Sequence, residues 1–308
     1  MTEYAIKAEG LVRKFGNFKA VDGLNLTVPT GSIYGFLGPN GCGKSTTIRM
    51  LTGLLSPTQG SVEVLGLSIP RQAEALRLRI GYMTQKFSLY EDLTARENLQ
   101  FIGQIYGMPD RQLSQRIDEQ LTTYGLTRLA TQRAGGMSGG QKQRLGLAAA
   151  TMHKPDLLFL DEPTSAVDPE NRREFWEQLF DLSDAGTTIL VTTHYMDEAE
   201  RCHALAIMEA GIVRADGAPE TLMNDMGVSV VEVEAVGLRQ LKEQLVSLPQ
   251  VRSAAQLGIR LRVLVDTAIE DPIAWLQQQQ PALRHGRLTL ARPSLEDVFV
   301  TCTGEGRQ

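Results

Sequence analysis

The sequence of 308 residues has little that would cross-link the chain, anchor it in a membrane or charge it strongly. Its three cysteines lie far apart without CxxC spacing, so neither a disulfide framework nor a zinc site is expected, and a reducing compartment fits best. No apolar run approaches the roughly 18 residues of a membrane span, and the start lacks the basic and apolar stretches of a secretion signal. The 31 basic and 36 acidic side chains give a net charge of −5, which argues against nucleic-acid binding through a general basic field.

The remaining composition is that of a folded protein, with 42% hydrophobic and 22% charged residues. At roughly 150 residues per domain, the length suggests two domains. Residues 1–217 alternate strand-like and helix-like segments, and a mostly helical stretch lies within them at about 87–150. A turn-rich change of composition precedes a smaller α/β pattern over 218–308. Short apolar runs such as 187–192 are typical of parallel strands that are covered on both faces.

A phosphate-binding loop is the strongest local signal, because the strand-like segment 32–37 leads into a glycine-rich turn and then into a helix expected over 44–55. Glycines let successive backbone N–H groups face phosphate oxygens, and the helix start adds its positive dipole end. Lys44 would reach the β- and γ-phosphates, and the Ser45 hydroxyl would bind Mg²⁺. A glycine-rich turn without a ligand is the alternative interpretation. The loop consists of Gly38, Pro39, Asn40, Gly41, Cys42, Gly43, Lys44, Ser45 and Thr46.

Two adjacent carboxylates, Asp161 and Glu162, end another strand-like run, at the position where open α/β sheets bind their ligands. Asp161 would hold Mg²⁺ through its water shell, and Glu162 would polarise the attacking water. Adjacent acids at a strand end could equally cap a helix. The phosphate loop upstream favours the catalytic interpretation.

A third motif, Ser138-Gly139-Gly140-Gln141, comes directly before a helix expected over 142–155. A serine N-cap followed by two glycines again exposes backbone N–H groups at a positive helix end. One phosphate loop already accounts for one triphosphate, so this motif implies a further nucleotide contact.

In their order along the chain, which is the phosphate loop, then Ser138 to Gln141, then Asp161-Glu162, the three motifs resemble those of the ATP-binding cassette (ABC) family, over about residues 4–217. The resemblance implies a P-loop NTPase fold of the α/β class, with a mixed sheet core, a helical subdomain and a small C-terminal α/β accessory domain. It also implies that the third motif is the signature loop, which contacts the γ-phosphate bound by the opposite subunit. Two cassettes would then enclose two ATP molecules head to tail, with the loop 165–168 crossing their interface.

The same resemblance implies roles for single residues. Gln85 would sense the metal and the γ-phosphate, and would bind Mg²⁺ together with the groups named above. His194 would contact the γ-phosphate, and Asp168 would lie in the loop at the dimer interface. Phe15 would stack on adenine, with Phe18 as its competitor. Without the resemblance, each of these residues would be read as an ordinary structural or solvated residue.

Cys42 departs from the alanine that many members of the family carry at this place in the loop. Its side chain is small enough to keep the turn, so ATP binding should be retained. Helix N-termini lower thiol pKa values, and we therefore hypothesise that Cys42 is a reactive thiolate whose alkylation blocks nucleotide binding.

Segments 83–94 and 193–200 and the ending 293–299 look like those of the ATPase subunits of bacterial ABC-2-type exporters, a group that includes daunorubicin-resistance and multidrug efflux ATPases. In the ending, Ser294 and Asp297 have the spacing of a capping box. An apolar helix face follows, formed by Leu295, Val298 and Phe299. This face either packs onto the small domain, which we favour, or forms a dimer contact.

We therefore expect an ATP-hydrolysing subunit that powers an ABC-2-type exporter, with ATP and Mg²⁺ as its ligands. Its expected partners are a second cassette, most simply in a homodimer, and an integral membrane permease on a separate chain. The permease would hold it on the cytoplasmic face of the inner or plasma membrane. An importer ATPase, or an ABC ATPase that acts on ribosomes or DNA, are the alternatives. A P-loop kinase or switch-type NTPase would explain the phosphate loop but not the signature motif.

Overall fold

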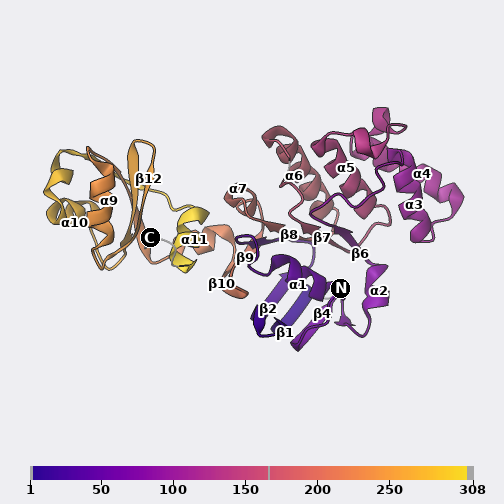
Figure 1. Cartoon of the computed structure of the whole chain (residues 1–308), viewed down its shortest axis with the longest axis horizontal. Helices are drawn as coiled ribbons and strands as arrows, with labels where there is room; N and C mark the ends of the chain where they lie inside the picture. Colours follow the sequence, from indigo (N-terminus) through magenta and orange to yellow (C-terminus); the bar gives the residue numbers. More distant parts are fainter. Residues whose placement is uncertain (1–2, 166, 304–308) are drawn as a thin grey trace. The chain divides into compact units, whose positions relative to one another are not determined.

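The structure is a computed structural model that describes residues 3–165 and 167–303. Ala166, in the loop expected at the dimer interface, lies outside the described residues. The chain divides into two compact units, Met1–Val213 and Arg214–Gln308, which follow one another along the colour scale of Figure 1. Each unit has a hydrophobic core of its own.

A sheet with parallel inner strands forms the centre of the first unit. Its strands are, in spatial order, β10 (Ile212–Gly217), β9 (Ala204–Glu209), β3 (Ile33–Leu37), β8 (Thr188–Thr193), β7 (Leu157–Asp161) and β6 (Ile80–Met83). The edge strand β10 begins in this unit and continues past its last residue, Val213. The pairs from β9 through β3, β8 and β7 to β6 are parallel. Every residue of β3, β7 and β8 is buried, as their continuous apolar runs predict, because both faces of the sheet are covered.

Helices cover this central sheet. They are α1 (Lys44–Leu51), α2 (Ala73–Arg77), α3 (Ala95–Ile105), α4 (Asp110–Thr123), α5 (Gly139–Ala150), α6 (Pro169–Asp184) and α7 (Met196–Ala199), with 3-10 turns at Thr127–Leu129 and Ala134–Gly136. On one face of the sheet, Leu158 and Ile189 pack into a core shared with helices α3 to α6. On the other, Phe36 and Phe159 pack with Ile48 of α1. Figure 1 shows α5 and α6 on one side of β7 and β8, and α1 on the other.

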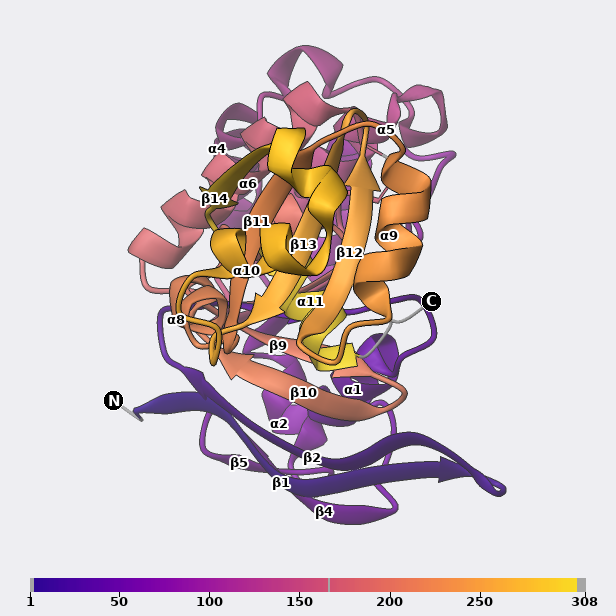
Figure 2. The same ribbon diagram turned by 90° about the vertical axis from the view of Figure 1, so that its left-hand side faces the viewer.

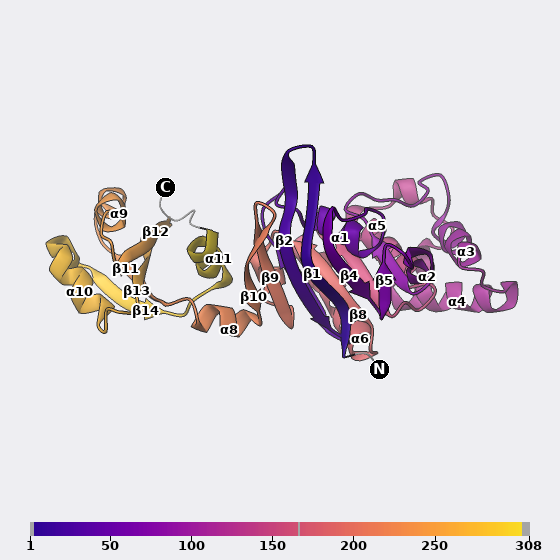
Figure 3. The same ribbon diagram turned by 90° about the horizontal axis from the view of Figure 1, so that it is seen from below.

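A second, antiparallel sheet covers the α1 side of the central sheet. Its strands are, in spatial order, β2 (Phe18–Pro29), β1 (Tyr4–Phe15), β4 (Gln59–Val64) and β5 (Leu67–Ile69), and Figure 3 shows them side by side. The sequence interpretation did not single out these strands. The pairing of β1 with β2 contains several register shifts, for example between Ala8 and Leu11. Such bulges interrupt the two-residue alternation by which a half-buried strand is recognised.

Helix α1 is shorter than expected, since it ends at Leu51 instead of reaching residue 55. Gly53 has φ +72°, and a Cβ there would lie 2.5 Å from the Cβ of Ala73. The chain therefore leaves the helix through a left-handed turn before it reaches Ser56. Within the described part of the chain, no helix has both the length and the apolar character needed to cross a membrane.

The second unit is built on an antiparallel sheet. Its strands are, in spatial order, β12 (Val251–Leu257), β13 (Arg260–Asp266), β11 (Val228–Glu234) and β14 (Arg287–Ala291). Its helices are α8 (Pro219–Asn224), α9 (Leu238–Val246), α10 (Pro272–Gln279) and α11 (Leu295–Thr303), with a 3-10 turn at Pro281–His285. Alternation in β11 sends Val231 toward a core shared with α9 and α10, and sends Val230 to the opposite face, where Val300 of α11 packs. Figure 2 looks onto the face with α9 and α10.

The expected capping box begins α11. Asp297 accepts hydrogen bonds from the Ser294 hydroxyl and backbone N–H, both at 2.8 Å, and its own N–H donates to Ser294 Oγ at 3.4 Å. Leu295 and Val298 are buried inside the second unit, at 0% and 2% exposure. The apolar face of this helix therefore packs onto its own domain, as favoured from the sequence.

Candidate nucleotide-binding site

The phosphate loop lies between the end of β3 and the start of α1, and close backbone approaches require its glycines. A Cβ on Gly38 would lie 2.3 Å from the carbonyl oxygen of Met208 in β9, and one on Gly43 would lie 2.5 Å from that of Ala20 in β2. Gly43 also has φ +112°, which L side chains rarely adopt. The loop is thus held against two neighbouring strands, and α1 begins directly after it at Lys44.

The Lys44 side chain folds back into this loop. Its ammonium donates to the carbonyl oxygens of Gly38, at 2.7 Å, and Pro39, at 3.1 Å, and lies 3.4 Å from Glu162 Oε1. The side chains of Lys44 and Glu162 are only 4% and 7% exposed. Each charge is therefore largely removed from water and compensated by the other.

The Asp161 carboxylate and the Glu162 backbone, at the end of β7, share a hydroxyl partner. Asp161 Oδ1 accepts hydrogen bonds from Ser45 Oγ at 3.1 Å and from Thr192 Oγ1 at 2.8 Å. The same Thr192 oxygen accepts the backbone N–H of Glu162 at 2.8 Å. The sequence interpretation did not include Thr192 in the site. The sequence feature that could have indicated Thr192 is its place near the end of an apolar run. In the structure this run is β8, the strand adjacent to β7, and Thr192 lies opposite Asp161.

Two further predicted residues converge on Glu162. Gln85, which follows β6, donates from Nε2 to Glu162 Oε2 at 2.9 Å. His194, which follows β8, has its Nδ1 3.4 Å from the same oxygen without the alignment of a hydrogen bond. Glu162 itself has φ +48°, a left-handed backbone conformation that is strained for a residue with a side chain and is typical of functional sites. The structure therefore brings Lys44, Gln85 and His194 around one carboxylate.

Of these groups, Lys44, Gln85 and Glu162 line a cavity of about 410 Å³ together with two aromatic side chains, and His194 is not part of its lining. Phe15 and Phe18 are 48% and 65% exposed. The Arg13 guanidinium lies 4.6 Å from the centre of the Phe15 ring, so one face of this ring already has a cationic neighbour. Residues of the phosphate loop complete the lining: Asn40, Gly41, Gly43, Lys44, Ser45 and Thr46. The cavity therefore brings together the phosphate loop, Gln85 from the predicted metal contacts, and Phe15 and Phe18 from the predicted adenine contacts.

The hypothesis of a reactive Cys42 expects a lowered thiol pKa, and this expectation is wrong because the pKa is raised. The side chain is 4% exposed, and burial raises the pKa of the thiol. The charge of Lys44 and hydrogen bonds from backbone N–H groups lower this pKa, but by less than burial raises it. The thiol therefore remains protonated at neutral pH and fills space behind the loop.

The signature motif and Asp168 lie together away from this cavity. Ser138 caps α5 in a capping box with Gln141, whose N–H donates to Ser138 Oγ at 3.3 Å and whose Oε1 accepts the Ser138 N–H at 2.9 Å. A Cβ on Gly140 would lie 2.8 Å from the side chain of Asn171. Asn171 in turn donates to Asp168, the N-cap of α6, and hydrogen bonds from its side chain and then its backbone lower the pKa of Asp168. Neither this motif nor Asp168 lines the 410 Å³ cavity.

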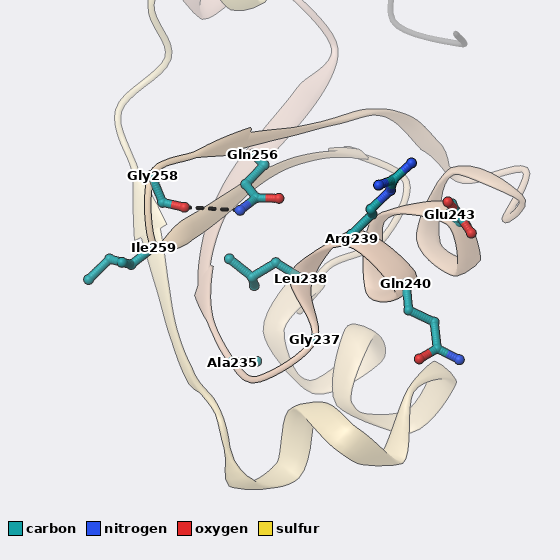
Figure 4. A pocket seen from close by; sticks show the side chains of 9 residues that line it. All are labelled: Ala235, Gly237, Leu238, Arg239, Gln240, Glu243, Gln256, Gly258 and Ile259. Atoms are coloured by element: carbon teal, nitrogen blue, oxygen red, sulfur yellow. Dashed lines mark hydrogen bonds between the residues drawn. The ribbon is translucent and has the colours of Figure 1, made fainter.

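A larger cavity, of about 650 Å³, lies in the second unit beside the β12–β13 hairpin and the start of α9 (Figure 4). Its polar contacts include Gln256 Nε2, which donates to the Gly258 carbonyl at 3.0 Å. The charged residues in its lining are Arg239 and Glu243. None of the residues predicted to bind nucleotide lines it, so the smaller cavity at the phosphate loop is the candidate site.

Residues 21–165 match the family described as ABC transporter. The chain is 46% identical over 220 residues to the "Probable multidrug ABC transporter ATP-binding protein YbhF" of Escherichia coli (strain K12), and the match covers 71% of this chain and 38% of that protein. The chain thus spans little more than a third of the length of that relative.

Two other relatives match over nearly their whole length. The "Nod factor export ATP-binding protein I" of Paraburkholderia xenovorans (strain LB400) is 39% identical over 311 residues, covering 100% of both chains. The "Daunorubicin resistance ATP-binding protein DrrA3" of Streptomyces coeruleorubidus is 35% identical over 311 residues, covering 100% of this chain and 98% of the relative.

Solved structures of ATP-binding cassettes share the fold. The cbiO1 protein from Clostridium perfringens, part of the ABC transporter complex cbiONQ, is 27% identical with a TM-score of 0.67, covering 72% of this chain and 92% of that one. A dimeric ATP-binding cassette in a post-hydrolysis state, bound to ADP and Pi, is 27% identical with a TM-score of 0.63, covering 68% and 97%. As its motifs predict, the chain belongs to the ABC transporter family and to the ATP-binding proteins within it.

Proposed function

We propose that this chain hydrolyses ATP to power an ABC-2-type exporter, with multidrug efflux among the transport classes it could serve. The observation that supports the proposal is the convergence of Lys44, Gln85 and His194 on Glu162, one residue after Asp161. Phosphoryl transfer requires such a set of charge-stabilising groups around a carboxylate that can orient water. The relatives that match over their full length are named for Nod factor export and daunorubicin resistance.

ATP would bind in the 410 Å³ cavity with its adenine against Phe15 and its triphosphate in the phosphate loop. The backbone N–H groups of the loop and the start of α1 would contact phosphate oxygens. Phosphate oxygens would replace the carbonyls of Gly38 and Pro39 as partners of the Lys44 ammonium. The buried cation is thus already positioned at the loop, with exchangeable partners.

Mg²⁺ fits the donor set beside this loop. Ser45 supplies a hydroxyl, Gln85 an amide oxygen and Asp161 a carboxylate, the last through a water molecule. Hard oxygen donors of this kind are what Mg²⁺ binds, and Ser45 and Asp161 already lie within hydrogen-bond distance of one another. When bound, the ion would neutralise charge on the β- and γ-phosphates.

In the proposed hydrolysis, Glu162 orients a water molecule in line with the γ-phosphorus and accepts its proton. A bond forms from the water oxygen to that phosphorus while the bond from phosphorus to the β–γ bridging oxygen breaks. ADP leaves, and the proton passes from Glu162 to the inorganic phosphate. Lys44 and His194 stabilise the negative charge that develops on the γ-phosphoryl oxygens.

A second cassette would complete the site. The Ser138 to Gln141 motif lies outside the cavity of its own chain, and its helix start presents backbone N–H groups that have no partner within the helix. A related cassette has been solved as a dimer with ADP and Pi. We propose that two copies of this chain pair so that the motif of each contacts the γ-phosphate of the other, with Asp168 at their interface.

A membrane permease would dock beside Gln85, on the helical part of the first unit. A small cavity of about 140 Å³ opens there, with Phe87 and Ile102 in its lining. Next to it, Tyr90 and Phe101 form an edge-to-face pair at 5.0 Å, and Ile105 is 60% exposed on the same helix as Phe101. Exposed apolar groups that lie together mark interaction surfaces. Such a contact would hold the chain on the cytoplasmic face of the membrane.

The test of the hydrolytic role is Glu162→Gln, which keeps the side-chain shape but removes the proton acceptor. We expect ATP affinity within about threefold of wild type and a kcat at least roughly a hundredfold lower, together with ATP-dependent dimers that persist in size-exclusion chromatography. Glu177→Gln, an exposed change on α6, is the control and should turn over normally. Wild-type turnover by Glu162→Gln would contradict the assigned role.

A further inference from the structure

A buried carboxylate that the proposed mechanism does not use lies beside the site. Glu198, in α7, is 1% exposed. One of its oxygens accepts a hydrogen bond from Thr164 Oγ1, and the other accepts one from Thr193 Oγ1 at 2.6 Å. Both threonines are also 1% exposed. A buried carboxylate with two protein donors is held in one orientation, because leaving either oxygen unpaired would be unfavourable.

The two threonines belong to the two segments that carry the groups around the γ-phosphate. Thr164 lies two residues after Glu162, in the loop that follows β7, and Thr193 directly precedes His194 at the end of β8. The Thr193 hydroxyl also accepts the backbone N–H of Tyr195 at 3.0 Å. The Thr193 hydroxyl therefore both donates and accepts a hydrogen bond. These bonds hold the chain at Thr193 and at Tyr195, on each side of His194.

Arg172 extends this cluster to a third segment. Its Nε lies 3.5 Å from Glu198 Oε1, and its guanidinium carbon lies 4.2 Å from the centre of the Tyr195 ring. Arg172 stands in the first turns of α6, whose N-cap is Asp168. Glu198 therefore has a cationic neighbour, and the loop after Glu162, the His194 loop and the start of α6 meet at one carboxylate.

We propose that Glu198 is a positioning residue that fixes the separation of Glu162 and His194 by holding Thr164 and Thr193 together. The inference rests on the proposed ATPase function, because it assigns Glu198 a part in that reaction. Catalytic groups must be held within a fraction of an ångström of their working geometry. Strands β7 and β8 fix the chain only as far as Asp161 and Thr193. The hydrogen bonds to Glu198 tie Thr164, in the loop beyond the end of β7, to Thr193, the last residue of β8 before His194.

The experiment compares threonine variants of the full-length chain. Thr193→Val keeps the shape of the side chain and removes its hydroxyl, Thr193→Ser retains the hydroxyl, and Thr164→Val breaks the cluster from the other side. The control is Thr151→Val. Thr151 is 2% exposed and its hydroxyl is bonded to Gln120 and Leu147, within the helical part of the same unit. For each variant we would measure kcat, KM for ATP, equilibrium binding of a fluorescent ATP analogue and the melting temperature.

We expect Thr193→Val and Thr164→Val to lower kcat about tenfold or more while analogue binding stays within about twofold. Thr193→Ser should recover most of the activity. Thr151→Val should lower the melting temperature to a similar degree without changing the kcat of the folded protein. These measurements distinguish a positioning role from general stabilisation. If the threonines only stabilised the fold, all three valine variants would have a lower melting temperature and an unchanged kcat.

Several results would overturn the inference. They are an unchanged kcat in both site variants, an equal loss of kcat in Thr151→Val, or a Thr193→Ser variant as slow as Thr193→Val. If one site variant fails to fold, the other still decides the question. A wild-type chain that binds ATP but does not hydrolyse it, even with its membrane partner, would instead remove the proposed function, and this inference with it.

Discussion

Lys44 and Glu162 form an ion pair inside the first unit, with their charged atoms 3.4 Å apart. Removing one partner of a buried pair leaves the other charge uncompensated, which costs about 3–5 kcal/mol. A substitution of Lys44 by a neutral residue would therefore combine weaker phosphate binding with lower stability. Glu162→Gln also removes one charge of the pair, but Lys44 keeps the carbonyls of Gly38 and Pro39 as partners and glutamine keeps an oxygen for the hydrogen bond from Gln85, so it is the more informative change.

The buried thiol of Cys42 gives a prediction about chemical labelling. Burial raises the pKa of both Cys42 and Cys302, but Cys42 is buried and Cys302 only half-buried. We therefore expect maleimide to modify the more accessible Cys302 first in the folded protein at pH 7, and Cys42 only after unfolding in urea. Mass spectrometry of tryptic peptides over time would follow both sites. Cys42→Ala should leave ATP turnover within about twofold of wild type. Rapid labelling of Cys42 that ATP prevents would restore the thiolate hypothesis.

Single residues of the site could be predicted where a motif fixes their spacing along the chain. Lys44 and Ser45 follow the loop glycines, and Asp161 ends an apolar run, so their common site was expected. Thr192 escaped prediction because its role depends on the register between β7 and β8, which sets it opposite Asp161. The burial of Cys42 was missed for a similar reason, since it depends on how closely the loop packs against β2 and β9.

Among secondary-structure elements, those with a single clear periodicity were predictable. The buried strands β3, β7 and β8 read as continuous apolar runs. The mostly helical stretch expected at about 87–150 contains α3, whose capping box at Thr94 was not predicted. Strand β12 was missed because only its first half, around Val251 to Ala254, is buried, and it ends in exposed polar residues. Its pairing with β13 through a turn at Gly258 defines it in the structure.

The start of α11 allows a prediction at this scale. Asp297 completes the capping box with Ser294 and also accepts three hydrogen bonds from Arg262, the shortest at 2.7 Å. We expect Asp297→Asn to lower the unfolding free energy of the second unit by about 1–3 kcal/mol. Urea unfolding in a Trp176→Phe background would measure this, because Trp275 of α10 is then the sole tryptophan of the chain. Glu296→Gln, one residue away and exposed, should change the free energy by less than about 0.5 kcal/mol.

The effect of Asp297→Asn should depend on pH in a defined direction. Burial raises the pKa of Asp297, but hydrogen bonds from Arg262 and Ser294 outweigh burial, and the net pKa lies below its ordinary value. A carboxylate with a lowered pKa stabilises the folded state above the pKa of the unfolded chain, and this stabilisation is lost as the pH falls through the folded pKa. The difference between the two proteins should thus be full at pH 7 and shrink below about pH 4. A difference that grows on acidification would contradict this assignment.

At the scale of the whole molecule, the groups of the nucleotide site all belong to the first unit. The second unit has its own core and buries the apolar face of α11 against its own sheet. The turn-rich change near residue 217 indicates where the two units meet in the sequence. Only the motifs indicate which of the two units would carry the chemistry. Recognition of those motifs was therefore decisive for predicting the site.

This separation predicts the result of a truncation. A chain of residues 1–217 should bind ATP within about threefold of the full chain, because every described group that lines the nucleotide cavity is retained. In a Glu162→Gln background, its ATP-dependent dimer affinity should also be unchanged, since Leu295 and Val298 of the α11 apolar face are already buried within the second unit. Sedimentation over a concentration series would measure it. A dimer weaker by tenfold or more would assign the second unit a part in assembly.

The hydroxyl of Thr192 donates its one hydrogen to Asp161, while its oxygen accepts a hydrogen bond from the backbone N–H of Glu162. The carboxylate proposed to hold Mg²⁺ and the backbone of the proposed base are thereby joined through a side chain of the neighbouring strand. A sliding of β8 against β7 would displace the Asp161 carboxylate and the Glu162 backbone together, so we expect the two residues to move as a unit. Any force that the chain transmits to or from a partner through β8 would thus change metal binding and water activation together.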